Sequence, residues 1–433
     1  MKNSGLMYAR ARCLPELHDE PPPRMPEIEI QARLFAGEFG TSWTTLDGGE
    51  IEVLHFGEWN REAGPDFRSA KLRLPGGEEQ LGDIEVDPDP RDWETHGHSR
   101  NPGFAGVLLQ LFVHSPGPRA FARTIENRAV HQARIQIERR TQRKFEGVPG
   151  TVDMTSALKM VSEAAAFRLR QKLLSHARAV SLHGPDTALF HSIARGLGYK
   201  NNSLPFLLVA QRAGLRTAGG IRGEALLFGL AGFLQPRTFD LADEVTRTYL
   251  KPLWDEWWAL RDAMARLVLP ASLWRLAGHR PQNHPHRRMG ALAATARSFA
   301  KLRKNVHSHG VAGFRDFFTG LQSNYWNRHW NLSAHPLARD LALVGADRVV
   351  DLLTNAYLPS LPFDAARFQM EQLKGPTPGG RIQRACEWLI GRFDPALCRS
   401  AFHQQGLLQL LADFGSLTPL EAWGKIQSGR PGS

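Results

Sequence analysis

The chain has 433 residues, of which 42% are hydrophobic and 22% are charged, a composition typical of a globular protein with room for two or three domains. Its formal net charge of +11 favours polyanionic partners such as nucleic acid. Three scattered cysteines form neither a zinc motif nor a disulfide framework, which suits a reducing cytoplasm. No secretory signal is expected in residues 1–17, and no apolar run is long enough to predict a membrane span.

The first 150 residues alternate between strand and helix patterns after a proline-rich lead-in over residues 1–26. The predicted elements are a helix, three strands, a second helix and a fourth, buried strand, at residues 27–36, 51–56, 66–74, 81–87, 92–98 and 107–113. Glycine and proline clusters separate these segments. The sequence therefore predicts an α/β domain over residues 27–145.

The pattern changes near residue 150, where apolar residues begin to recur at helical spacing. This predicts a larger, basic, all-α domain over residues 150–428. Its predicted helices cover residues 155–180, 187–197, 204–213, 223–234, 241–264, 288–304, 314–322, 339–355, 363–373, 380–391, 404–413 and 419–426.

Acidic residues alternate along the predicted strand over 81–87. Asp83, Glu85 and Asp87 are separated by single apolar residues, so their carboxylates share one face of the strand. Such close like charges repel one another unless a cation lies among them, and carboxylates suit Mg²⁺ or Mn²⁺. A solvated edge strand with acidic outward positions is the alternative interpretation.

The order helix–strand–strand–strand–helix–strand, with Pro65-Asp66 on the second strand and Glu85-Val86-Asp87 on the third, resembles the core of the PD-(D/E)XK nuclease superfamily. The resemblance implies a mixed sheet flanked by helices. It also implies that Asp66, Glu85 and the backbone carbonyl of Val86 hold Mg²⁺ or Mn²⁺ and that a water molecule attacks phosphorus. The chain departs from the superfamily at Asp87, where a lysine is usual. Asp87 is expected to act as an additional metal ligand or as a base that orients the water.

A closer resemblance covers nearly the whole chain. The motifs resemble those of an uncharacterised bacterial family of domains of unknown function, DUF2851-like, at Gly57-x-x-Asn60, Gly64-Pro65-Asp66-Phe67, Gly82-Asp83-Ile84-Glu85, Asp92-Trp93-x-x-His96-x-His98, Glu224 to Gly229, Arg280 to Arg288 and Tyr325-Trp326. The family pattern has His, Asp, Tyr and His where this chain has Asp87, Asn101, Phe104 and Gln110.

Two further polar groups are candidates for the same pocket. His96 and His98 follow the acidic strand on a predicted helix, where residues two apart face away from each other, so both reach one ion only if the segment is extended. His96 is accordingly expected as a general base or phosphate ligand, and a capping histidine is the alternative. Gln110 lies within an apolar strand, where it either faces the pocket or bonds a neighbour.

A dense basic loop opens the predicted helix at residue 288. We expect this loop to contact the phosphates of nucleic acid through Arg280, His284, Arg287 and Arg288. The alternative is a structural connection that its prolines make rigid. Together these features predict a metal-dependent phosphodiester hydrolase acting on DNA or RNA. A non-catalytic nucleic-acid-binding protein on a degenerate nuclease core is the second hypothesis, and Asp87 in place of lysine favours it.

Overall fold

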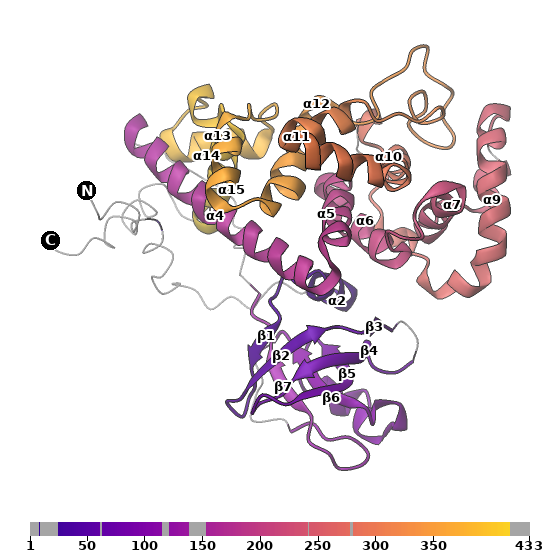
Figure 1. Cartoon of the computed structure of the whole chain (residues 1–433), viewed down its shortest axis with the longest axis vertical. Helices are drawn as coiled ribbons and strands as arrows, with labels where there is room; N and C mark the ends of the chain where they lie inside the picture. Colours follow the sequence, from indigo (N-terminus) through magenta and orange to yellow (C-terminus); the bar gives the residue numbers. More distant parts are fainter. Residues whose placement is uncertain are drawn as a thin grey trace.

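The computed structural model describes residues 25–60, 63–114, 121–137, 153–240, 242–277 and 280–415, together with Tyr8. A seven-stranded sheet is followed along the chain by a larger helical part, and the two lie side by side (Figure 1). The predicted helix at 419–426, most of the lead-in and the domain boundaries at 145 and 150 lie outside the described residues.

The sheet is mixed, as the sequence predicts. Its strands are β1 Ser42–Thr44, β2 Glu50–His55, β3 Glu58–Trp59, β4 Phe67–Arg73, β5 Glu79–Asp87, β6 Val107–Phe112 and β7 His131–Arg134. They are ordered β1-β2-β4-β5-β6-β7, with β3 paired to β4. Strands β2, β4 and β5 pair antiparallel, whereas β6 runs parallel to β5 and β7 parallel to β6. Every residue of β6 is buried, as its uninterrupted apolar sequence predicts.

Different side chains cover the two faces of the sheet. Helix α2 (Glu27–Phe35) packs Ile30 and Leu34 into an apolar cluster with the sheet, and this cluster includes Val86. A smaller cluster contains Trp93 of α3 (Asp92–Thr95) and Phe104 of a 3₁₀ turn (Pro102–Phe104). Because neighbouring strand residues point to opposite faces, Glu85 and Asp87 point away from the cluster that holds Val86.

The helical part follows the predicted order. Its α-helices are α4 Met154–His183, α5 Pro185–Leu197, α6 Tyr199–Ala213, α7 Gly220–Leu230, α8 Pro236–Asp240, α9 Glu244–Met264, α10 Pro285–Arg297, α11 Phe299–Thr319, α12 Ala346–Leu352, α13 Phe363–Gln372, α14 Gly380–Ile390 and α15 Ala401–Phe414. Short helical turns lie at Ala265–Leu267, Ala271–Leu273, Pro281–Asn283, Leu353–Tyr357, Leu358–Ser360 and Pro395–Cys398.

The largest departures from the predicted helix bounds lie between residues 288 and 346, and the helix predicted over 314–322 is the second half of α11. The helix predicted over 288–304 is interrupted at Ser298, which separates α10 from α11. The helix predicted from residue 339 begins only at Ala346. In the preceding segment the N–H groups of Leu337 and Leu341 donate to the carbonyls of Arg328 and Asn327, so tertiary hydrogen bonds replace those of a helix there.

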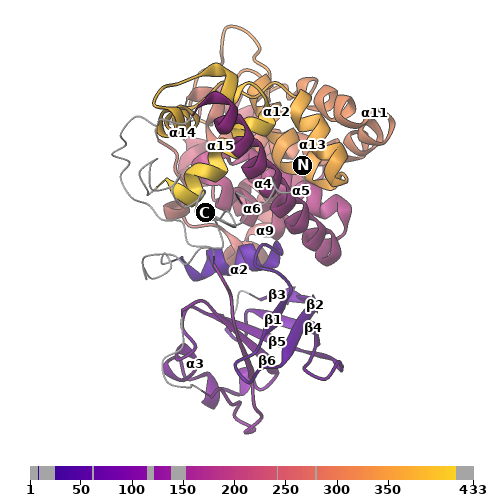
Figure 2. The same ribbon diagram turned by 90° about the vertical axis from the view of Figure 1, so that its left-hand side faces the viewer.

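Helix α2 belongs to both hydrophobic cores. Ile30 and Leu34 pack with the sheet, whereas Ala32 packs in the main core of the helical part. Leu182, in the last turn of α4, also packs in the sheet core. Figure 2 shows α2 lying between the sheet and the helices. The two parts are therefore joined by shared apolar packing as well as by the chain.

Two findings bear on the environment of the protein. Among the described residues no helix combines the length and the apolar character that a membrane span requires. Cys386 and Cys398 are buried free thiols, and Cys13 lies outside the described residues.

Candidate metal centre

Asp66 and Glu85 are neighbours where β4 begins and β5 ends. Phe67 pairs with Ile84 across these antiparallel strands, so the preceding and following residues are also neighbours. The Asp66 N–H donates to Glu85 Oε2 over 3.2 Å, and the Val86 N–H donates to Asp66 Oδ2 over 2.9 Å. Strand register therefore brings together the two acidic residues that the sequence analysis selected.

Helix α2 adds two side chains that the sequence analysis missed. Gln31 Nε2 donates to Asp66 Oδ1 and to Glu27 Oε1, each over 2.7 Å. Gln31 Oε1 accepts from Trp59 Nε1 over 3.2 Å. The i, i+4 spacing of Glu27 and Gln31 places them on one helix face, but nothing in the sequence shows that this face meets Asp66.

Both histidines reach the acidic residues, and the helix predicted over 92–98 is wrong at its end. Helix α3 ends at Thr95, and Gly97 has a φ of +76°, which turns the chain back. The rings of His96 and His98 lie with centroids 5.5 Å apart. His96 Nδ1 is 3.6 Å from Asp87 Oδ1, and His98 Nε2 is 3.3 Å from Glu85 Oε1. The expectation that a helix separates the two imidazoles is therefore incorrect.

Gln110 bonds to Asp87 inside the sheet. Its side chain is fully buried, and Nε2 donates to Asp87 Oδ2 over 2.7 Å and to the Pro90 carbonyl over 3.3 Å. Gln132 Nε2 in turn donates to Gln110 Oε1 over 2.7 Å. Gln110 and Gln132 are register partners on β6 and β7, whereas the bond from Gln110 to Asp87 runs diagonally to β5, and together these bonds hold the Asp87 carboxylate in one orientation.

Burial and mutual repulsion make this cluster retain protons. Burial, followed by repulsion from Asp66 and Asp87, raises the pKa of Glu85 to about 10. Burial, followed by the charge of Glu27, also raises the pKa of Asp66 well above its ordinary value. Burial raises the pKa of Asp87 to about 6. The carboxylates are thus desolvated and close together, which is the condition that a bound cation relieves.

His98 is a neutral imidazole at physiological pH. Burial, followed by the charge of His96, lowers its pKa to about 4, so its contact with Glu85 is not an ion pair at neutral pH. The ring stacks on Phe104 with centroids 4.0 Å apart. Its Nε2 is buried without a hydrogen-bond partner among the described residues. A neutral ring nitrogen of this kind is available as a metal ligand.

The donor set fits a divalent cation. Asp87, His96 and His98 can each offer one ligand atom, and these atoms lie within 4.8 Å of one another. Glu85 adjoins this group through His98, and Asp66 through Glu85. Carboxylates suit Mg²⁺ and Mn²⁺, while imidazoles favour Mn²⁺ of the two. The Val86 N–H binds Asp66, and metal binding by the Val86 carbonyl stays a prediction.

The four residues predicted to bind nucleic acid lie in different environments in the structure. Arg287 is 1% exposed, and its guanidinium donates to backbone carbonyls of Trp326, His329, Leu341 and Ala342. We therefore withdraw Arg287 as a nucleic-acid contact, because its side chain is buried and both Nη groups donate inside the core. His284 precedes α10 and accepts from the His286 N–H over 3.3 Å. Arg280 and Arg288 line a large cavity.

Comparison with known proteins shows the family. The model of the family described as "Protein of unknown function (DUF2851)" matches residues 38–375, and the chain belongs to this family. No curated protein and no solved structure matches the chain. The matched range covers the sheet strands and most of the helical part, including Asp66, Glu85 and both histidines.

Proposed function

We propose that this member of the DUF2851 family is a nuclease-like, metal-dependent phosphodiester hydrolase that acts on DNA or RNA. The observation that carries the proposal is the closeness of Asp66 and Glu85, whose backbone N–H and carboxylate are hydrogen-bonded, with the unpartnered ring nitrogen of His98 beside Glu85. Buried acidic groups in such contact with one another are characteristic of functional sites that hold a cation.

The arrangement of elements supports a PD-(D/E)XK-type core. Helix α2, strands β2, β4 and β5, helix α3 and strand β6 follow one another in the order on which that resemblance rests. Strand β3 and strand β1 are additions to this order, and β7 extends the sheet beyond β6. Asp66, which immediately precedes β4, neighbours Glu85 of β5 through the pairing of Phe67 with Ile84, and a shared ion requires such closeness.

Each polar side chain has a distinct part in this proposal. Asp66 and Glu85 would hold a divalent cation, which would neutralise charge at the phosphate and lower the pKa of a bound water. Gln31 and the Val86 N–H orient the Asp66 carboxylate. Asp87 Oδ1 accepts the proton of the attacking water, because its pKa of about 6 leaves it ionised near neutrality. Gln110 positions Asp87, and His96 Nδ1 receives the proton from it.

A second candidate is a non-catalytic nucleic-acid-binding protein on a degenerate nuclease core. Asp87 favours it, since an acidic residue supplies no positive charge where the superfamily has lysine. The hydrogen bonds from Gln110 and Gln132 give Asp87 a structural role inside the sheet. This candidate predicts nucleic-acid binding that weakens with salt and is not followed by cleavage.

Cleavage assays with DNA and RNA substrates in Mg²⁺ or Mn²⁺ distinguish the two candidates. We expect cleavage by the native protein and its loss in Asp66→Asn and Glu85→Gln, since each removes a charged ligand. Asp83→Asn is the matched control, because Asp83 lies on the same strand but accepts from the Ser69 N–H instead. Cleavage that persists in both variants, or that is absent from the native protein while binding is present, would reject the hydrolase.

A further inference from the structure

A large cavity lies in the helical part, on the other side of α2 from the carboxylates. Its volume is about 1570 Å³, above the range of about 300–1,000 Å³ for small-molecule pockets. The walls come from the loop after α2, the middle of α4, α5, α12 and α15. Gln31 of α2 contacts Asp66, whereas Arg33 of the same helix lines the cavity. The cavity is therefore distinct from the candidate metal centre.

The wall of this cavity is strongly basic. Nine lysine and arginine residues line it against three aspartate and glutamate residues. Two of the three carboxylates are paired, since Glu38 binds Arg33 over 2.9 Å and Asp351 binds Arg348 over 2.7 Å. An excess of positive charge thus remains within a concave surface, where low-dielectric walls strengthen the field.

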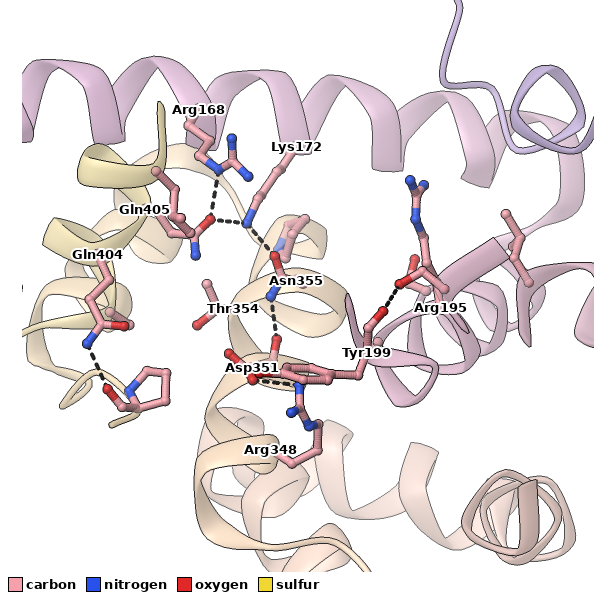
Figure 3. A pocket seen from close by; sticks show the side chains of 18 of the residues that line it. Arg168, Lys172, Arg195, Tyr199, Arg348, Asp351, Thr354, Asn355, Gln404 and Gln405 are labelled. Atoms are coloured by element: carbon pink, nitrogen blue, oxygen red, sulfur yellow. Dashed lines mark hydrogen bonds and ion pairs between the residues drawn. The ribbon is translucent and has the colours of Figure 1, made fainter. Parts of the chain in front are cut away.

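Several of these cations form no ion pair with another described residue. Among the described residues, no carboxylate lies within 4.0 Å of Lys172, Arg178, Arg280 or Arg288. Lys172 Nζ instead donates to Asn355 Oδ1 over 2.5 Å and to an amide oxygen of α15 over 2.6 Å, as Figure 3 shows. Burial, followed by the charge of Arg168, lowers the pKa of Lys172 well below its ordinary value, and an anion bound beside it would favour the charged form.

Buried donors at the wall lack partners. Arg288 is 4% exposed, and its Nη2 donates to Asn283 Oδ1 over 2.5 Å. Its Nε and Nη1 have no hydrogen-bond partner among the described residues, and neither has the hydroxyl of Thr354, which is 2% exposed. A buried donor left unsatisfied costs about 1–3 kcal/mol. Donors of this kind at the wall of a basic cavity indicate an anionic ligand.

The cations are too widely spaced for one phosphate. Arg168, Lys172 and Arg178 extend over ten residues of α4, which corresponds to about 15 Å along the helix. Arg280 and Arg288 come from a different segment, at the start of α10. A ligand that meets all of them must carry several phosphate groups in a row.

We propose that this cavity binds the successive phosphate groups of a single-stranded segment of nucleic acid. The identity of the polyanion rests on the proposed function, whereas the anionic character of the ligand rests on the cavity itself. Lys172 and Arg280 contact the phosphates directly, and Arg288 supports them from the wall. Phosphate contacts of this type position a strand without reading its sequence.

Binding of a labelled single-stranded oligonucleotide, followed by fluorescence anisotropy over a range of salt concentrations, tests this proposal. The full chain is used in EDTA, so that binding is measured without cleavage. We expect Lys172→Gln combined with Arg280→Gln to weaken binding and to reduce the slope of log K against log salt by about 1.4, or about 0.7 for each lost phosphate contact.

The matched control removes the same charges elsewhere. Lys251 and Arg315 are exposed on α9 and α11 and do not line the cavity. Lys251→Gln combined with Arg315→Gln should leave the slope unchanged. Equal effects of the two double variants would overturn the proposal, as would binding of inorganic pyrophosphate or a nucleoside triphosphate that the oligonucleotide does not displace.

Cleavage separates this proposal from the hydrolase. Asp66→Asn should bind the oligonucleotide as the native protein does, because the cavity is unchanged. If the Lys172/Arg280 double variant binds the oligonucleotide like the native protein, and the native protein cleaves, then the cavity proposal is rejected and the hydrolase proposal is kept. If binding depends on the cavity residues but the native protein does not cleave, then the hydrolase proposal is rejected and the cavity proposal is kept.

Discussion

Glu85 has the most strongly altered acidity among the residues whose pKa is given a value here. It is 7% exposed and lies between Asp66 and Asp87, so both burial and repulsion disfavour its charged form. The folded protein therefore holds this proton up to a pKa of about 10, whereas the unfolded chain releases it near 4.5. Between these values the native state binds more protons, so the stability of the metal-free protein falls as pH rises.

This predicts a pH-dependent melting temperature in EDTA that Glu85→Gln flattens. One proton contributes at most about 1.4 kcal/mol per pH unit, and the substitution removes that dependence. Thermal melting at several values between about pH 6 and pH 9 measures it. Glu79→Gln is the control, since Glu79 lies on the same strand with Lys71 and Arg73 and should not alter the slope. An unchanged slope in Glu85→Gln would contradict the buried, protonated state.

The sequence predicts which carboxylates meet but not every neighbour they have. The sequence analysis pairs Asp66 with Glu85 through the resemblance to the PD-(D/E)XK core, and the antiparallel register of β4 and β5 makes the two residues neighbours. Arg287 could not be placed, since the carbonyls that it binds lie 39 to 55 residues further along the chain. An arginine that binds nucleic acid from a loop and an arginine that binds carbonyls in the core show the same sequence pattern. Only the tertiary packing distinguishes them.

At the scale of elements, the termination of α3 decides the geometry of the metal centre. Periodicity predicts a helix as far as residue 98, whereas Gly97 adopts the left-handed conformation and begins a separate turn at His98. Glycine is the residue that most readily ends a helix in this way. The order of the elements along the chain was easier to predict than this turn, because each element depends on many residues and the turn depends on one.

Gly97→Ala should therefore weaken binding of Mn²⁺ by up to about tenfold, which corresponds to about 1.4 kcal/mol of left-handed strain. A Cβ at this position meets nothing within 4 Å, so the effect is one of backbone conformation alone. Gly97→Asn should retain most of the affinity, because asparagine tolerates this conformation. Isothermal titration calorimetry measures the affinities.

Gly76→Ala is the control for this prediction. Gly76 also has a positive φ, of +102°, and open space around its Cβ, but it lies in the turn between β4 and β5. It should lower the melting temperature without changing the affinity for Mn²⁺. Equal affinities in Gly97→Ala and Gly76→Ala would show that the turn does not position His98.

At the scale of the whole molecule, α2 couples the sheet to the helices. Ile30 and Leu34 pack with the sheet, Ala32 packs with the helical core, and Gln211 of α6 donates to the Ala32 carbonyl over 3.1 Å. The sequence predicts both parts, since strand and helix periods differ clearly. It does not predict their shared helix, because an amphipathic segment of nine residues gives no sign of two partners.

This coupling predicts that Mn²⁺ raises the melting temperature of the entire protein, although the proposed ligands of the ion lie in the sheet part. A ligand at 100 times its dissociation constant stabilises the native state by about 2.7 kcal/mol. Circular dichroism at the helical band reports mainly on the helices from α4 to α15, and we expect this signal to shift together with tryptophan fluorescence in one transition. In Asp66→Asn the shift should be lost. Two separate transitions, of which only one responds to Mn²⁺, would mean that α2 does not transmit stability between the two cores.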